Sequence, residues 1–290
     1  MHGAGPITPI RGAHNRCRPQ IPMTEPSSAE SATESSAQLV SPVVRGLRLL
    51  RYIAEGGSTA NLSEVGRLID VNRVTVMRLL ATLEHEGVIE RLPQGGHRIG
   101  LGFLTMASAG LGACDLVETG RRFLERLCFE LGLSAYLVLM DGNDIVYVAR
   151  EMPASGLVSN IRVGSRVPAY LTAPGRAMLA ALPPEDLQAR FGGVELVRHV
   201  DKNPATLAQL QAVLEQDRQA GCAWSFSGYE AGIDACAAAV LGRSGAPLAA
   251  LSVVGADHMF SRDEAFAEKV QAAVKQAAGE LACIAGRQPG

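Results

Sequence analysis

The chain has 290 residues, of which 47% are hydrophobic and 19% are charged, and its formal net charge at pH 7 is −2. This composition is typical of a globular protein with one large or two ordinary domains, and it excludes a uniformly basic protein that coats nucleic acid. No apolar run is long enough to predict a transmembrane helix, and the basic N-terminus lacks the apolar core of a secretory signal.

Cysteine and histidine usage argues against a metal or disulfide framework. The six cysteines, at positions 17, 114, 128, 222, 236 and 283, form no Cys-x-x-Cys pair. Most lie in apolar stretches such as DACAAAV, so we expect buried, reduced thiols in a cytoplasmic protein without a membrane partner. The histidines do not cluster at the spacing of metal ligands, and no cofactor is expected. A redox- or metal-responsive regulator that uses Cys222, Cys236 and Cys283 is the alternative function left open.

Residues 1–38 are expected to form a disordered tail. Their stretch EPSSAESATESSAQ cannot bury enough apolar surface to offset the entropy lost on ordering. Met23 stands directly before this stretch and is a candidate translation start. Hydrophobic periodicity begins only at Val43, so we expect the first folded domain to begin near residue 39.

Residues 39–100 predict three helices followed by two short strands. The first helix, in VVRGLRLLRYIAEG, has four apolar residues on one face: Val44, Leu47, Leu50 and Ile53. The second lies in NLSEVGRLI with Asn61 as its N-cap, and the third in NRVTVMRLLATLEHEG. Strand-like VIERL and HRIGL flank the turn-forming PQGG, which gives the element order of a winged helix-turn-helix. A linker helix is expected within residues 101–115.

The N-terminal end of the third helix carries polar residues suited to reading DNA. In a helix-turn-helix this end enters the major groove, where Arg can contact guanine, Asn adenine, and Thr a thymine methyl group or a phosphate. Residues of the wing would contact phosphates or the minor groove. We predict that double-stranded operator DNA is contacted by Asn72, Arg73, Thr75, Val76, Arg78, His97 and Arg98.

Three of these residues have alternative interpretations. Asn72 could be an N-cap whose side chain is used up on backbone N–H groups. Arg78 could be a solvated charge or could pair within the domain. Val76 also belongs to the apolar stripe of its helix, which is expected to pack on the first two helices.

Residues 116–290 predict a mixed domain that begins with a helix and a hairpin. A long helix is expected near Leu116–Leu131. The stretch SAYLVLMDGNDIVYVAR then predicts a hairpin around Asp141-Gly142-Asn143. A further strand is expected in GLVSNIRV, residues 156–163.

The rest of this domain alternates helices with strands. Pro183-Pro184 divides APGRAMLAALPPEDLQARF into two short helices. A helix in NPATLAQLQAVLEQDRQAG has Asn203 as its expected N-cap and Gly221 just after its end. A buried strand, PLAALSVVGA, precedes a closing helix over Glu264–Ala285. The fold class is therefore α+β.

Catalytic motifs are missing from the sequence. It contains no Gly-x-Ser-x-Gly, no His-Glu-x-x-His and no P-loop. Asp141 and Asp144 fall in a predicted hairpin turn, where turn chemistry explains them. We therefore expect no enzymatic activity.

Several stretches in the N-terminal third, RGLRLLRYIAEG, NLSEVGRLIDVNRVTVMRLLATLEHEGVIER and GHRIGLGFLTMAS, resemble the DNA-binding domain of IclR-type transcriptional regulators. Further on, IVYVAR, IRVGSRVPAYLTAPGRAMLAAL and GYEAGIDACAAAVLGRSGAPLAALSVVG resemble their effector domain. The resemblance runs from about Val43 to about Ala285. It implies a winged helix-turn-helix, a linker helix and a C-terminal GAF-like domain that binds a small organic effector. It also implies homodimers or homotetramers on pseudo-palindromic operators of catabolic genes.

The resemblance also implies which residues bind the effector. These are Thr172, Ala173, Ser225, Ile233, Ala235, Ser252 and Val254. Ser225 stands where relatives that bind small acids place an acidic residue, and Val254 replaces a serine. The pocket has thus lost polar groups, while Trp224, Phe226 and Tyr229 lie nearby. It suits a larger, aromatic acid as effector, unless these aromatic side chains belong to the hydrophobic core.

Overall fold

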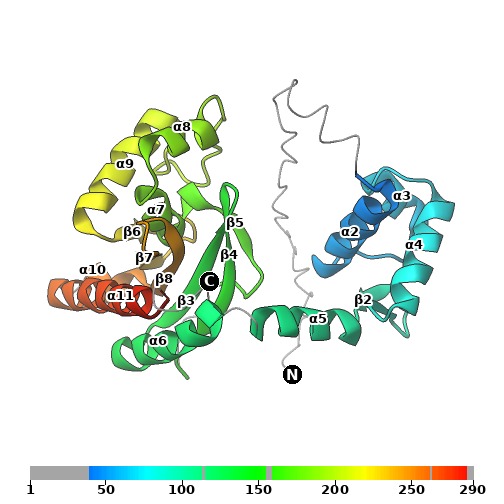
Figure 1. Cartoon of the computed structure of the whole chain (residues 1–290), viewed down its shortest axis with the longest axis horizontal. Helices are drawn as coiled ribbons and strands as arrows, with labels where there is room; N and C mark the ends of the chain where they lie inside the picture. Colours follow the sequence, from blue (N-terminus) through cyan, green and yellow to red (C-terminus); the bar gives the residue numbers. More distant parts are fainter. Residues whose placement is uncertain (1–38, 113–114, 155–158, 262, 286–290) are drawn as a thin grey trace, which may run out of the picture. The chain divides into compact units, whose positions relative to one another are not determined.

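The computed structural model describes residues 39–112, 115–154, 159–261 and 263–285 of the chain. The predicted tail over residues 1–38, the candidate start Met23, and two of the cysteines therefore lie outside the described residues. The chain forms two compact units that divide between Phe103 and Leu104. Helix α5, Leu101–Gly112, runs across this division (Figure 1). No helix among the described residues is long and apolar enough to cross a membrane.

The first unit has the predicted order of three helices and two strands. Its elements are α2 (Ser41–Ala54), α3 (Leu62–Leu68), α4 (Arg73–His85), β1 (Ile89–Arg91) and β2 (His97–Ile99). The two strands pair antiparallel, with Glu90 opposite Arg98. A small core of buried side chains from the helices and β1 holds the unit together. The winged helix-turn-helix expected from the sequence is confirmed.

The turn between α3 and α4 depends on a glycine in α3. The Val71 N–H donates to the Gly66 carbonyl at 2.8 Å, and Asp70 adopts a positive φ of 56°. A Cβ on residue 66 would lie 2.6 Å from the Val71 carbonyl oxygen. Only glycine lets the backbone approach this closely, so Gly66 sets the angle at which α4 leaves the turn.

The apolar residues predicted to share one face of α2 are not equally buried. The buried residues of this helix are Leu49, Leu50 and Ile53, whereas Leu47 is 58% exposed. The helix therefore faces the core along its C-terminal part, where it packs against α4 and β2. The exposed Leu47 adds an apolar side chain to the surface of α2.

The second unit contains most of the secondary structure. Its helices are α6 (Asp115–Leu131), η2 (Ala169–Leu171), α7 (Ala173–Ala180), α8 (Pro184–Phe191), α9 (Leu207–Ala220), α10 (Asp257–Ser261) and α11 (Glu264–Ala285). Its strands are β3 (Ser134–Asp141), β4 (Asp144–Glu151), β5 (Arg166–Pro168), β6 (Ala223–Phe226), β7 (Ile233–Leu241) and β8 (Pro247–Ala256).

These strands form a single antiparallel sheet covered on both faces. The strand order is β5-β4-β3-β8-β7-β6. Helices α6 and α11 pack on one face and enclose one hydrophobic core, while α7, α8 and α9 enclose a second core against the other face. The sheet with its helices confirms the α+β class and the expected GAF-like domain (Figure 1).

Two local expectations for this unit are wrong. The described part of the predicted strand GLVSNIRV, residues 159–163, has no strand, and its Ser159 hydroxyl and Asn160 N–H donate to the Glu230 carboxylate instead of to a neighbouring strand. Asn203 does not cap α9. Thr206 does, through a hydrogen bond from the Gln209 N–H to the Thr206 hydroxyl.

Candidate functional site

The N-terminal end of α4 presents the polar side chains predicted to meet DNA. Arg73 and Arg78 are exposed, and neither forms an ion pair with any residue that the structure describes. Asn72 is the N-cap, since its Oδ1 accepts a hydrogen bond from the Thr75 N–H at 2.8 Å. The Thr75 hydroxyl donates to the same oxygen at 3.0 Å. Two uncommitted guanidinium groups therefore stand at the helix end that a helix-turn-helix turns toward bases.

Two of the predicted DNA contacts are wrong, because their side chains are buried inside the unit. Val76 is fully buried in the core beneath α4. The His97 side chain is 7% exposed, and its Nδ1 shares a 2.8 Å hydrogen bond with the Thr59 hydroxyl. Burial lowers the pKa of His97, and the Glu84 carboxylate, 3.9 Å from Nε2, raises it less. The neutral imidazole therefore links strand β2 of the wing to the segment before α3. It is not exposed for contact with a phosphate.

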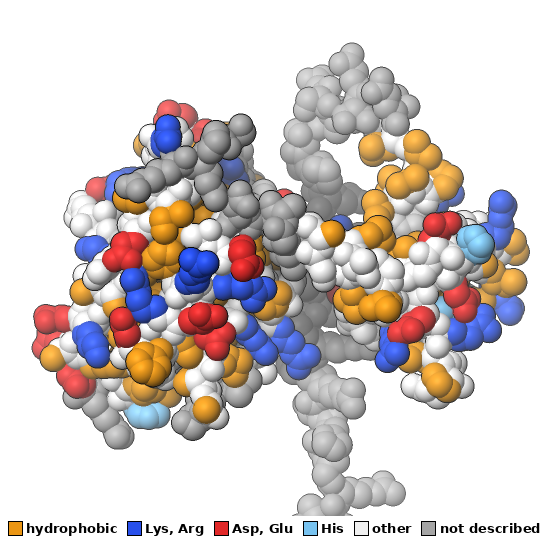
Figure 2. All heavy atoms as spheres, turned by 60° about the horizontal axis from the view of Figure 1, so that its bottom comes forward, with side chains coloured by type: hydrophobic (Ala, Val, Ile, Leu, Met, Phe, Trp, Pro, Cys, Tyr) orange, Lys and Arg blue, Asp and Glu red, His pale blue; other side chains and the backbone are white. Residues whose placement is uncertain are grey.

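Of the two predicted wing contacts, Arg98 stays exposed. The Arg98 side chain is 65% exposed, and its Nε lies 2.5 Å from Glu90 Oε1 on the opposite strand. An exposed pair of this kind contributes at most about 1 kcal/mol, so Arg98 can exchange its partner for a phosphate at small cost. Figure 2 shows arginine side chains projecting from the first unit next to acidic ones.

A single pocket of the second unit brings together all seven residues implied as effector contacts. It is lined by Thr172, Ala173, Ser225, Ile233, Ala235, Ser252 and Val254, and further by Tyr147, Ser159, Ile161, Pro174, Tyr229 and Glu230. Residues from β6, β7 and β8 form one wall, and the start of α7 forms another. The residues are distant in sequence, and the sheet register joins them: Ala235 lies opposite both Ser225 and Val254.

Hydroxyl groups dominate the polar lining of this pocket. Thr172 caps α7 by accepting a hydrogen bond from the Gly175 N–H at 3.2 Å. The Ser252 hydroxyl is buried and has no hydrogen-bond partner in the described structure. Burial raises the pKa of Tyr147 strongly, so its phenol stays neutral. No Lys or Arg lies among the lining residues, so an anion here would be held by hydroxyl and backbone donors.

Glu230 closes one side of the pocket. Its carboxylate accepts hydrogen bonds from the Ser159 hydroxyl at 2.7 Å and from the Asn160 N–H at 3.0 Å. The cavity that remains measures about 30 Å³. This volume holds about two water molecules, so the pocket is too small for an aromatic ring in this conformation.

Three polar residues of the pocket, Tyr147, Ser159 and Glu230, were not predicted from the sequence. Tyr147 could have been found, because buried residues alternate along β4 and this one alone carries a polar tip. The other two lie in segments without regular structure. No periodic signal marks them, and only the folded chain brings them to the pocket.

Trp224 and Phe226, which were expected to lie near the pocket, do not line it. Successive side chains of a strand point to opposite faces of the sheet. Ser225 lines the pocket, so its neighbours Trp224 and Phe226 face α11 instead and line a separate groove. Tyr229 does line the pocket, beyond the end of β6.

The cysteines named for a redox or metal role do not form a common site. Cys222 and Cys236 are buried, whereas Cys283 is exposed on α11. A hydrogen bond from Cys236 lowers the pKa of the Cys222 thiol, against the effect of burial. Among the described residues no three Cys, His, Asp or Glu side chains gather closely enough to hold a metal ion.

Comparison with known families matches both units. Residues 42–93 match the IclR helix-turn-helix domain, and residues 108–282 match the family described as "Bacterial transcriptional regulator IclR C-terminal". The second match alone spans more than half of the chain.

Individual proteins show the same likeness. The chain is 27% identical over 231 residues to the "HTH-type transcriptional repressor AllR" of Klebsiella pneumoniae, covering 79% of this chain and 84% of that protein. It is 27% identical over 248 residues to the "Pca regulon regulatory protein" of Pseudomonas putida, covering 84% of each. A solved IclR homolog complexed with 4-hydroxybenzoate, from Microbacterium hydrocarbonoxydans, shares the fold with a TM-score of 0.72 at 21% identity, over 83% of this chain and 98% of that one.

Proposed function

The chain belongs to the IclR family of bacterial transcriptional regulators, and we propose that a small aromatic acid controls its binding to operator DNA. The observation that carries this proposal is the gathering of the seven implied effector residues around one small pocket. The proposed targets are genes of a catabolic pathway. The relatives include a repressor and the regulator of the Pca regulon.

The DNA contacts that we propose lie on α4 and the wing. Arg73 and Arg78 would enter the major groove, with Thr75 and the amide nitrogen of Asn72 at the same helix end. Arg98 would contact a phosphate beside them. Val76 and His97 act only by holding α4 and the wing in place, since both side chains are buried.

An aromatic acid with a hydroxyl group fits the polarity of the pocket. Its carboxylate would accept hydrogen bonds from Ser225 and Ser252 beside the N-terminus of α7, where helix N–H groups favour an anion. The ring would lie against Ile233 and Val254. A hydroxyl at the far end could donate to Glu230, because a carboxylate accepts more than the two hydrogen bonds it has here.

The small size of the pocket offers a way to couple effector binding to DNA binding. A ring with a carboxylate cannot enter a cavity of about 30 Å³ unless the lining residues move apart. An effector would therefore bind an opened conformation and shift the protein toward it. If the two conformations differ in operator affinity, the coupling would be of the usual size, about 1–3 kcal/mol.

A homodimer is the simplest assembly consistent with the surface of the first unit. Four apolar residues of α2 and the segment before it are more than half exposed: Leu39, Val40, Val43 and Leu47. Contiguous exposed apolar side chains mark an interaction surface. A second copy bound there would give two α4 helices for a pseudo-palindromic operator. We place this regulator in the cytoplasm, where its operator lies.

The proposal is tested with the DNA that separates this gene from its neighbours. In a gel-shift assay the protein should bind this DNA and lose or gain affinity when 4-hydroxybenzoate is added. Calorimetry should show that 4-hydroxybenzoate binds more tightly than glyoxylate. Binding of glyoxylate alone would overturn the aromatic effector, and failure to bind any DNA segment would overturn the regulator.

A further inference from the structure

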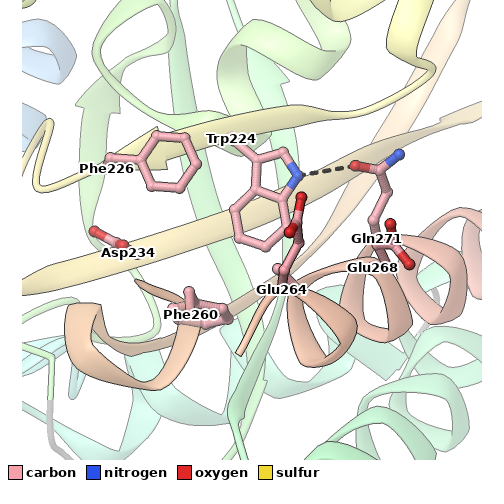
Figure 3. Close-up of a pocket in the computed structure, with 8 residues that line it drawn as sticks. Trp224, Phe226, Asp234, Phe260, Glu264, Glu268 and Gln271 are labelled. Atoms are coloured by element: carbon pink, nitrogen blue, oxygen red, sulfur yellow. Dashed lines mark hydrogen bonds between the residues drawn. The ribbon is translucent and has the colours of Figure 1, made fainter. Parts of the chain in front are cut away.

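A second hollow of the C-terminal unit lies on the sheet face opposite the effector pocket. It is a groove of about 440 Å³ lined by Trp224, Phe226, Asp234, Phe260, Glu264, Ala267, Glu268 and Gln271. Figure 3 shows the β6 and β7 side chains facing those of α10 and α11 across it. Its size is that of a pocket for a small organic molecule, and none of its residues lines the effector pocket.

Three aromatic rings form the apolar part of the groove. The rings of Trp224 and Phe226 are parallel within 1°, with centroids 5.5 Å apart. Phe260 meets Trp224 edge to face at 5.4 Å. The Trp224 Nε1–H donates to Gln271 Oε1 at 3.1 Å, which fixes the indole in place (Figure 3). Phe226 is 55% exposed, so the aromatic surface is open to a ligand from solvent.

The charged residues of the groove all carry the same sign. Glu264 and Glu268 lie one turn apart at the start of α11 and are exposed. Asp234, which lies to one side of the rings in Figure 3, is 4% exposed, and its Oδ1 accepts a hydrogen bond from the Ser227 N–H at 2.8 Å. Burial raises the pKa of Asp234, and the hydrogen bond from Ser227 and the charge of Lys202 offset this only in part. No Lys or Arg lines the groove.

We propose that this groove is a binding site for an organic cation, an ammonium or guanidinium ion with an apolar substituent. The cation would lie near the faces of Trp224 and Phe226, where ring quadrupoles attract positive charge within about 6 Å. The carboxylates would neutralise it, and the apolar substituent would cover exposed ring surface. An anion or a neutral molecule of the same shape lacks both electrostatic attractions.

Two ligand sites would then share two strands. Ser225 and Ala235 face the effector pocket, while their neighbours Trp224 and Asp234 face the groove. Cation binding in the groove does not depend on the proposed effector, because the groove lies on the opposite face of the sheet. Its test needs neither operator DNA nor effector.

Trp224 is the only tryptophan of the chain, so its fluorescence reports on the groove directly. We expect benzyltrimethylammonium to change the emission of the full-length protein along a saturable curve, with weaker binding at higher salt. Benzyl alcohol and benzoate should give no saturable change. The double variant Glu264→Gln/Glu268→Gln should weaken binding about tenfold, since it removes two of the three charges. Phe226→Leu should also weaken it, by removing a ring while keeping an apolar side chain.

A matched double variant controls for net charge and folding. Glu125→Gln/Glu185→Gln removes two exposed carboxylates that do not line the groove, and it should bind the cation as the unchanged protein does. Equal weakening in both double variants would overturn the proposal, as would equal binding of benzyl alcohol. A second copy of the chain in the groove would also overturn the proposal. It would show as emission that changes with protein concentration alone, together with sedimentation that changes in Glu264→Gln/Glu268→Gln.

Discussion

The Asn72 side chain is committed to the helix that it begins. Its Oδ1 accepts hydrogen bonds from both the N–H and the hydroxyl of Thr75, at 2.8 and 3.0 Å. Reading adenine through two hydrogen bonds requires both the oxygen and the nitrogen of an Asn amide. Because the oxygen is occupied, Asn72 acts mainly as an N-cap, and base recognition falls to the exposed arginines of α4.

Replacing Arg78 by alanine should weaken operator binding by about 1–3 kcal/mol, or roughly five- to 150-fold, if Arg78 reads a base. The side chain is exposed and has no ion-pair partner in the described structure, so folding should be unaffected. Fluorescence anisotropy with labelled operator measures the change. Arg122→Ala, an exposed arginine of α6, is the control and should bind normally. An unchanged affinity of Arg78→Ala would remove this residue from the interface.

Val76 and Val74 provide a matched pair within one helix. Val76 is fully buried, and Val74 is 63% exposed. Val76→Ala should lower the free energy of unfolding by about 2 kcal/mol, because a buried apolar side chain is lost and a cavity remains. Val74→Ala should change it by less than about 0.5 kcal/mol. Urea unfolding followed by circular dichroism compares the two, and equal losses would contradict the assignment of Val76 to the core.

The wing should loosen in mild acid because of His97. Burial lowers the pKa of this imidazole below its usual 6.5. Between pH 6.5 and the lower folded-state pKa, the unfolded chain therefore binds the proton more readily than the folded one. Stability is retained above this window and falls as the pH drops through it.

Hydrogen exchange of the β1 and β2 amides, corrected for the intrinsic effect of pH, measures this loss. Protection should fall with decreasing pH in the unchanged protein. In His97→Gln, which does not titrate, protection should depend much less on pH. A pH dependence that is the same in both proteins would show that another group is responsible.

The unpaired hydroxyl of Ser252 predicts opposite effects on stability and on binding. In the ligand-free protein this buried oxygen has no partner in the described structure, so Ser252→Ala should leave the free energy of unfolding unchanged or raise it. If the hydroxyl holds an effector carboxylate, the same variant should weaken effector binding by about tenfold. Thermal unfolding and calorimetry with 4-hydroxybenzoate measure the two effects. A variant that is destabilised but binds the effector normally would contradict this role.

The sequence predicts the elements with clear signals well. The helix over Glu264–Ala285 has the predicted bounds, and the hairpin turns at the predicted place, because their hydrophobic periods and turn residues agree. Residues 233–241, IDACAAAVL, received no predicted element, although they form strand β7. Alanine favours helices, and only pairing with β6 and β8 selects the strand at this place.

The site residues could be predicted where the position of a residue along a strand decides which face of the sheet its side chain points to. The alternation of β6 would have separated Ser225 from Trp224 and Phe226, had this strand been predicted. The burial of His97 could not be predicted, because its hydrogen-bond partner Thr59 is 38 positions away in the sequence. The hydrogen bond from the Ser159 hydroxyl to Glu230 likewise forms only in the folded chain.

The most direct test of the central claim is the affinity of the full-length protein for its intergenic DNA, measured by anisotropy with and without a saturating effector. We predict saturable binding that weakens as salt increases, and a shift of the dissociation constant by about five- to 150-fold on addition of an aromatic acid such as 4-hydroxybenzoate. The same dissociation constant with and without every aromatic acid tested, in a protein that binds the DNA, would contradict the account.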